Sequence, residues 1–205
     1  MNAIDPEKQL LNFELRKQPI VNRLFVEDVD ILVIHNPGVF TESAFNELDI
    51  FLKNGGGLIW FSSGIEADPA FDKYFSNLNF PIAHDIMKSD FGTFNVRVPK
   101  IKDNAIYDLD VRKLSDELPE VFQYIKHTTK SKQKVHLELN NGDPLLIDFK
   151  RGNGKVFYFS SILDLDWNDM PLRGLLVPLM YKLLVLGGTD EVNSMPVKLG
   201  SVKWI

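Results

Sequence analysis

The sequence contains no cysteine among its 205 residues. This absence excludes disulfide bonds, thiolate metal sites and a cysteine nucleophile. It leaves the redox compartment open, because a cysteine-free chain suits the cytoplasm and the periplasm equally. Histidine is scarce and scattered, and its spacing builds no metal site, so we expect neither a metal nor a cofactor. The four histidines are His35, His84, His127 and His136.

Long apolar runs and an excess of positive charge are also lacking. The longest apolar run, residues 175–186, has about twelve residues and contains Lys182, whereas a membrane-spanning helix needs about 20. The first residues, Met1–Pro6, are polar and lack the apolar core of a signal peptide. The formal charge of −5 offers no electrostatic argument for nucleic-acid binding. With 44% hydrophobic and 25% charged residues, the composition is that of an ordinary globular protein.

The segment 28–64 predicts a parallel βαβ unit around which the rest of the chain is organised. Asp30–His35 is an apolar, β-branched run typical of a strand buried on both faces. Thr41 is placed to cap a helix, whose apolar residues then recur at helical spacing. Asn54–Gly57 ends this helix, and Leu58–Phe61 is a second buried strand.

Later segments add antiparallel strands to this unit. Val135–Leu139 and Pro144–Phe149 flank an Asn-Gly turn, which favours a hairpin. Lys155–Phe159 follows a second tight turn and continues the pattern. Residues 172–186 predict a helix that is kinked or restarted at Pro178. The sequence therefore predicts an α/β fold with a mostly parallel sheet and antiparallel strands at its edge.

Six stretches of the chain follow one another in a characteristic order and spacing. They are Ala3–Pro6, Asp30–Phe61, Leu118–Phe122, Gly142–Leu146, Gly152–Ser161 and Leu163–Trp167. Together they resemble the class I glutamine amidotransferase-like domain, which is a three-layer flavodoxin-like sandwich. More narrowly, they resemble the version of this domain found in bacterial BatA-type membrane proteins of the aerotolerance group.

The resemblance implies a domain organisation and a location. The amidotransferase-like domain is expected to span residues 1–190, with residues 191–205 as an extension that begins a truncated β module. BatA-type proteins carry membrane helices near both ends and an extracytoplasmic middle. The resemblance thus implies a periplasmic domain excised from a membrane-anchored parent, with protein partners in the cell envelope.

The catalytic residues of true amidotransferases are missing. The family places an oxyanion-hole turn where this chain has His35–Gly38, and a nucleophilic cysteine where it has Phe61–Gly64. A His-x-Glu pair belongs after the late strand, but residues 159–164 contain no histidine. Glutamine hydrolysis by this scheme needs a thiolate and a base. We therefore expect the domain to be catalytically silent.

A serine hydrolase is the other enzymatic interpretation. Ser62 or Ser63 would be the nucleophile, His35 the base, and Asp164 or Asp166 the orienting acid. Such a nucleophile usually sits in Gly-x-Ser-x-Gly, because the backbones must pass closely. Here two large aromatic residues precede the serines. Capping or turn roles for these serines are therefore favoured.

The resulting hypothesis is an interaction or ligand-sensing module. If a ligand binds, it should lie where parallel strands end, in a crevice with His35 at its base. The other predicted lining residues are Asn36, Pro37, Gly38, Ser62, Ser63 and Asp164. The alternative is a small-molecule, for example carbohydrate, binder or hydrolase. Residues 154–160 are similar to ThuA-like proteins and to the β-galactosidase trimerisation domain, although the histidine that usually follows in ThuA-like proteins is absent.

Overall fold

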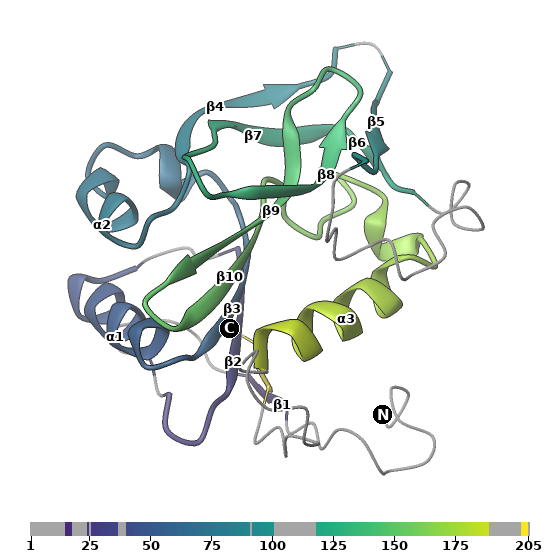
Figure 1. Ribbon diagram of the computed structural model, residues 1–205. Helices are drawn as coiled ribbons and strands as arrows, with labels where there is room; N and C mark the ends of the chain where they lie inside the picture. Colours follow the sequence, from purple (N-terminus) through teal and green to yellow (C-terminus); the bar gives the residue numbers. More distant parts are fainter. Residues whose placement is uncertain are drawn as a thin grey trace, which may run out of the picture.

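The computed structural model describes residues 15–17, 24, 26–36, 40–90, 92–100, 118–188 and 202–204 (Figure 1). In chain order its elements are β1 Leu15–Lys17, β2 Ile31–His35, α1 Glu42–Lys53, β3 Gly57–Phe61, η1 Ile65–Ala67, α2 Asp72–Asn77, β4 Ile82–Lys88, β5 Phe94–Arg97, β6 Glu120–Val121, β7 Gln123–Thr128, β8 Lys134–Leu139, β9 Pro144–Arg151, β10 Gly154–Phe159, η4 Met170–Leu172, α3 Leu176–Gly188 and β11 Val202–Trp204. No helix within these ranges is long and apolar enough to cross a membrane.

The main sheet has the strand order β1-β11-β2-β3-β10-β9-β8-β5-β6. Its strands pair in parallel from β1 to β10 and antiparallel from β10 to β6. The predicted α/β fold, with a parallel βαβ unit at its centre, is confirmed. The antiparallel part is more extensive than an edge, however, and β4 and β7 form a second, two-stranded sheet that the sequence did not indicate.

Strand β11 lies between β1 and β2 in the main sheet, and pairs in parallel with both. Residues 202–204 are thus part of the same sheet as the βαβ unit. The domain boundary predicted at residue 190 stays a prediction, because residues 189–201 lie outside the described ranges.

The three layers follow from the alternation of side chains along β2. Ile31 and Val33 belong to the apolar cluster that includes the buried face of α3. Leu32 and Ile34 belong to the cluster that includes α1 and α2. Since successive side chains of a strand point to opposite faces, a run buried on both faces needs helices on both sides. Figure 1 shows α1 and α3 on opposite sides of the central strands.

Local sequence signals set both ends of α1. The Thr41 hydroxyl accepts a hydrogen bond from the Ala44 N–H at 3.2 Å and is the N-cap. At the other end, the N–H groups of Gly55 and Gly56 donate to carbonyls of the last turn at 3.1 and 3.0 Å. This pattern is a Schellman motif, and Gly55 supplies its left-handed position with φ of 102°. The predicted helix is confirmed.

The last helix starts close to Pro178, which agrees with the predicted restart and not with the predicted kink. The segment predicted as one helix over residues 172–186 is divided into η4 and α3, with a break at Arg173–Leu175. Pro178 lies in the first turn of α3, where backbone N–H groups have no partner within the helix. The proline therefore marks the start of α3 instead of a kink in its middle.

Candidate functional site

The predicted crevice residues lie at the carboxyl ends of the parallel strands, as the βαβ unit requires. His35 ends β2, Ser62 and Ser63 follow β3, and Asp164 lies in the loop after β10. His35 is in register with Phe61, so β2 and β3 end at the same edge. Asn36 has a left-handed φ of 48°. The remaining two predicted residues, Pro37 and Gly38, lie outside the described residues.

The His35 ring is fixed in place by a backbone hydrogen bond and an aromatic contact. Its Nε2 accepts a hydrogen bond from the Leu163 N–H at 3.1 Å, and its ring lies edge-on to Phe61 at 5.8 Å. Burial lowers the pKa of His35 and outweighs the Leu163 hydrogen bond and the charge of Asp164, which both raise it. An Nε2 that accepts an N–H is unprotonated, so this contact also requires the neutral ring. The side chain joins the end of β2 to the loop after β10.

Ser62 and His35 are on opposite faces of the sheet. His35 follows Ile31 and Val33 at a spacing of two residues, toward the α3 face, while Ser62 follows Trp60, which packs toward α1. The alternative Ser-His-Asp arrangement with Ser62 as the nucleophile is therefore not formed in the described residues. There, no hydrogen bond joins Ser62 or Ser63 to an imidazole nitrogen.

The Ser62 hydroxyl is instead bound by a carboxyl group that the sequence did not single out. It donates to Glu66 Oε2 at 2.7 Å, and the Gly64 N–H donates to the same oxygen at 3.2 Å. The Trp60 Nε1–H donates to the other carboxyl oxygen. Glu66 is only 3% exposed, and burial raises its pKa. In the sequence, Glu66 is visible only as a glutamate four residues after Ser62. The same pattern is equally typical of an exposed acidic residue at the start of a helix.

The second sheet covers the edge at β3 and β10. The Ile125 N–H of β7 donates to the Ser160 carbonyl at 2.6 Å, and the Ser161 hydroxyl donates to the Gln123 carbonyl at 3.0 Å. The Ile125 side chain also lies beside Gly64 in the turn after β3, 3.5 Å from where a Cβ on that glycine would be. Strand β7 thus occupies the position in which open α/β sheets bind ligands. The part of the predicted crevice around His35 is not covered by these contacts.

The loop that carries Asp164 is held by internal hydrogen bonds. The buried Asn168 amide donates to the Ser161 hydroxyl at 2.9 Å, and Asp164 Oδ1 accepts the Asp166 N–H at 2.8 Å. Asp164 itself is exposed. Its carboxylate stabilises the turn, and among the described residues no three His, Asp or Glu side chains gather in a metal-binding arrangement. The crevice stays a prediction as a ligand site.

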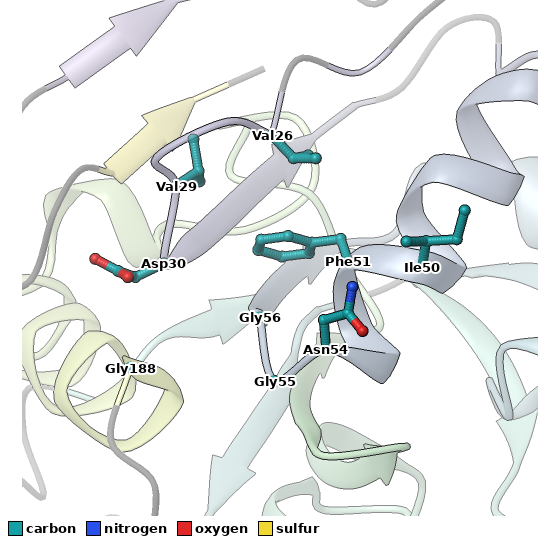
Figure 2. A pocket seen from close by; sticks show the side chains of 9 residues that line it. All are labelled: Val26, Val29, Asp30, Ile50, Phe51, Asn54, Gly55, Gly56 and Gly188. Carbon is teal, nitrogen blue, oxygen red and sulfur yellow. The ribbon is translucent and has the colours of Figure 1, made fainter.

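A pocket of about 390 Å³ lies at the opposite, amino-terminal edge of the strands (Figure 2). Its lining comes from the segment before β2, the end of α1, the turn before β3 and the end of α3. The residues are Val26, Val29, Asp30, Ile50, Phe51, Asn54, Gly55, Gly56 and Gly188. The sequence analysis did not indicate this site, because its parts come together only in the folded chain.

No family model and no curated protein matches the sequence. Solved structures do share the fold. The cytoplasmic protein STM3548 from Salmonella typhimurium has a TM-score of 0.63 at 18% identity, covering 80% of this chain and 74% of that chain. A ThuA-like protein from Bacteroides uniformis has a TM-score of 0.56 at 12% identity, covering 75% and 67%. For a β-galactosidase from Bacillus circulans the TM-score is 0.50 at 18% identity, covering 82% and 23%.

The chain has a flavodoxin-like α/β fold. Likenesses at these identities show the fold alone, and ThuA-like proteins carry the class I amidotransferase-like version of it. The predicted fold class is therefore confirmed. The narrower resemblance to BatA-type proteins has no support among these relatives and stays a prediction.

Proposed function

We propose that this chain is a non-catalytic interaction or ligand-sensing module of a larger bacterial envelope protein of the BatA type. One observation carries the proposal. Ser62, in the turn where the resemblance places the nucleophile of amidotransferases, is fully buried, and its hydroxyl is bonded to Glu66. A nucleophile has to reach its substrate and a base, and this hydroxyl is in contact with neither an imidazole nor solvent.

The same fold within longer chains supports a role as one part of a larger protein. In the β-galactosidases from Bacillus circulans and Rahnella, the matched region is 23% and 24% of the chain. Placement in the envelope rests on the BatA-type resemblance only, and STM3548 and STM1381 are named cytoplasmic proteins. A fusion of alkaline phosphatase to this domain in the full-length gene product tests the placement. High phosphatase activity in intact cells is expected. Activity no higher than that of a control fusion that stays in the cytoplasm would overturn the placement.

The absence of catalysis is tested with the wild-type chain and two variants, Ser62→Ala and Ser63→Ala. Substrates are glutamine, p-nitrophenyl acetate and p-nitrophenyl β-galactoside. We expect all three proteins to release product at the same background rate. A wild-type rate above background that either substitution abolishes would identify a serine nucleophile and overturn the proposal.

A second candidate is a ThuA-like small-molecule binder or hydrolase. It is favoured by the shared fold of the ThuA-like protein and of two β-galactosidases, whose names point to carbohydrate chemistry in those proteins. A thermal-shift series with galactose, trehalose and related sugars tests this candidate. A concentration-dependent rise in melting temperature that is lost in His35→Ala would favour it over the interaction module.

A further inference from the structure

The β4–β7 sheet is anchored to the rest of the molecule by buried side chains of β7. Its two strands pair with each other and lie apart from the main sheet (Figure 1). Five of the seven residues of β4 are exposed, whereas Tyr124, Ile125 and His127 of β7 are buried. A two-stranded sheet is at best marginally stable by itself. The attachment of this sheet therefore depends on what β7 buries.

His127 is a basic group at this buried contact. Its ring is 5% exposed and lies edge-on to the ring of Tyr158 in β10, with 5.3 Å between the centroids. Its Nδ1 lies 3.2 Å from the Ile125 carbonyl, and a carbonyl only accepts, so Nδ1 carries the proton. Nε2 is then the unprotonated nitrogen of a neutral ring, and within the described ranges it has no hydrogen-bond partner. A proton added to Nε2 would bring a charge into this contact without an acceptor for it.

The titratable groups around the ring do not compensate such a charge. Burial is the largest influence on His127 and lowers its pKa. The backbone hydrogen bond and the charge of Asp143, in the turn before β9, raise this pKa, while the charge of His84 in β4 lowers it further. From β10 the ring faces Tyr158, whose own pKa is raised well above its ordinary value by burial and by the charge of Glu66. Tyr158 therefore stays neutral in acid, and the pKa of His127 is lowered overall.

We propose that the β4–β7 sheet is an acid-labile cover over the carboxyl edge of β3 and β10, and that protonation of His127 releases it. Release breaks the hydrogen bond from the Ile125 N–H to the Ser160 carbonyl, and the one from the Ser161 hydroxyl to the Gln123 carbonyl. It uncovers the position in which open α/β sheets bind ligands. The cover goes beyond the module proposed above, because its release does not depend on what the domain binds.

The direction of the pH effect follows from the burial of the ring. In the released state water surrounds His127, and its pKa returns to about 6.5. Below about pH 6.5 the released state therefore binds a proton that the attached state does not bind. The attachment is strongest above this pH, and it weakens as the pH falls. The ratio of released to attached molecules rises by up to about tenfold for each pH unit, until the lowered pKa of the attached state is reached.

Amide hydrogen exchange of the ¹⁵N-labelled chain, followed by NMR between about pH 7 and pH 5, tests the proposal. Each rate is divided by that of an unstructured peptide at the same pH, which gives a protection factor. The Ile125 amide reports on the cover, and the Ile59 amide of β3 reports on the main sheet. The protection of Ile125 should fall with pH by several-fold or more relative to that of Ile59. A constant ratio of the two protection factors would overturn the proposal.

Two variants identify the group that titrates. His127→Phe keeps an aromatic ring against Tyr158 but cannot be protonated, so the relative protection of Ile125 should no longer fall in acid. His84→Gln is the matched control, because it removes an exposed histidine of the same sheet and should retain the fall seen in the wild type. A fall that persists in His127→Phe, or one that disappears in His84→Gln, contradicts the assignment. The two amides of the wild type decide the matter even where His127→Phe does not fold.

Discussion

Removal of the Glu66 carboxyl group should cost a large part of the stability of this protein. Glu66→Ala leaves the Trp60 Nε1–H and the Ser62 hydroxyl buried without their acceptor, and the Gly64 N–H loses the same partner. A buried donor left unsatisfied costs about 1–3 kcal/mol. Two such donors and the space left by the side chain give about 3–6 kcal/mol, against a typical total of about 5–15 kcal/mol. The melting temperature should fall by at least about 6 °C.

The pH dependence of the same group has a definite sign. Burial raises the pKa of Glu66, so the folded state retains a proton that the unfolded chain releases. The contribution of Glu66 is fully present below the ordinary pKa of glutamate, and is lost as the pH rises through the raised pKa. Glu66→Gln does not titrate. The unfolding free energy of the wild type relative to this variant should therefore decrease as the pH rises through that window.

Urea unfolding followed by circular dichroism measures both effects. Ser62→Ala removes one of the three donors to Glu66 and should cost about 1 kcal/mol. Ser63→Ala is the matched control, because its hydroxyl makes no hydrogen bond within the described residues, and it should stay within about 0.5 kcal/mol of the wild type. A loss below about 1 kcal/mol in Glu66→Ala would show that the three donors do not depend on this carboxyl.

Two further changes test the start of β10 and a buried ion pair. In Gly154→Ala the new methyl carbon would lie 2.4 Å from two backbone carbonyl oxygens, so the variant should be severely destabilised or insoluble. Gly142→Ala has open space around it and a φ of 89°, and should lose only about 1–2 kcal/mol of unfolding free energy in the same urea assay. Burial opposes ionisation of Asp148, but His136 and Lys155 outweigh this effect and lower the Asp148 pKa. This carboxylate therefore stabilises the fold above its ordinary pKa, and the stabilisation is lost as the pH falls through the lowered pKa. Asp148→Asn should then be less stable than the wild type at neutral pH and indistinguishable from it in strong acid, and an equal difference at both pH values would contradict this assignment.

Local patterns in the sequence predicted many of the helices, strands and turns of the fold. The apolar run of β2, the Thr41 cap and the glycines after Asn54 each act through residues a few positions apart, so their structural effect can be predicted from the chain alone. The hairpin of β8 and β9 around Asn141-Gly142 belongs to the same class, and it too is present. These elements, and the edge at which His35, Ser62 and Asp164 lie, required no knowledge of distant contacts.

Contacts between distant segments decided what surrounds that edge. The β7 strand covers the ends of β3 and β10, Glu66 binds Ser62, and β11 inserts between β1 and β2. The two strand placements depend on pairing across many residues, and exposed backbone edges accept any strand of suitable length, so local propensity does not select the partner. Glu66 is only four residues from Ser62, but its burial beside Trp60 is set by the packing around it. The pocket at Asp30 likewise exists only because two helix ends and two strand starts meet in space. The sequence thus determined the elements and their order, whereas tertiary packing determined which of their polar groups are buried, which are bonded and which line a cavity.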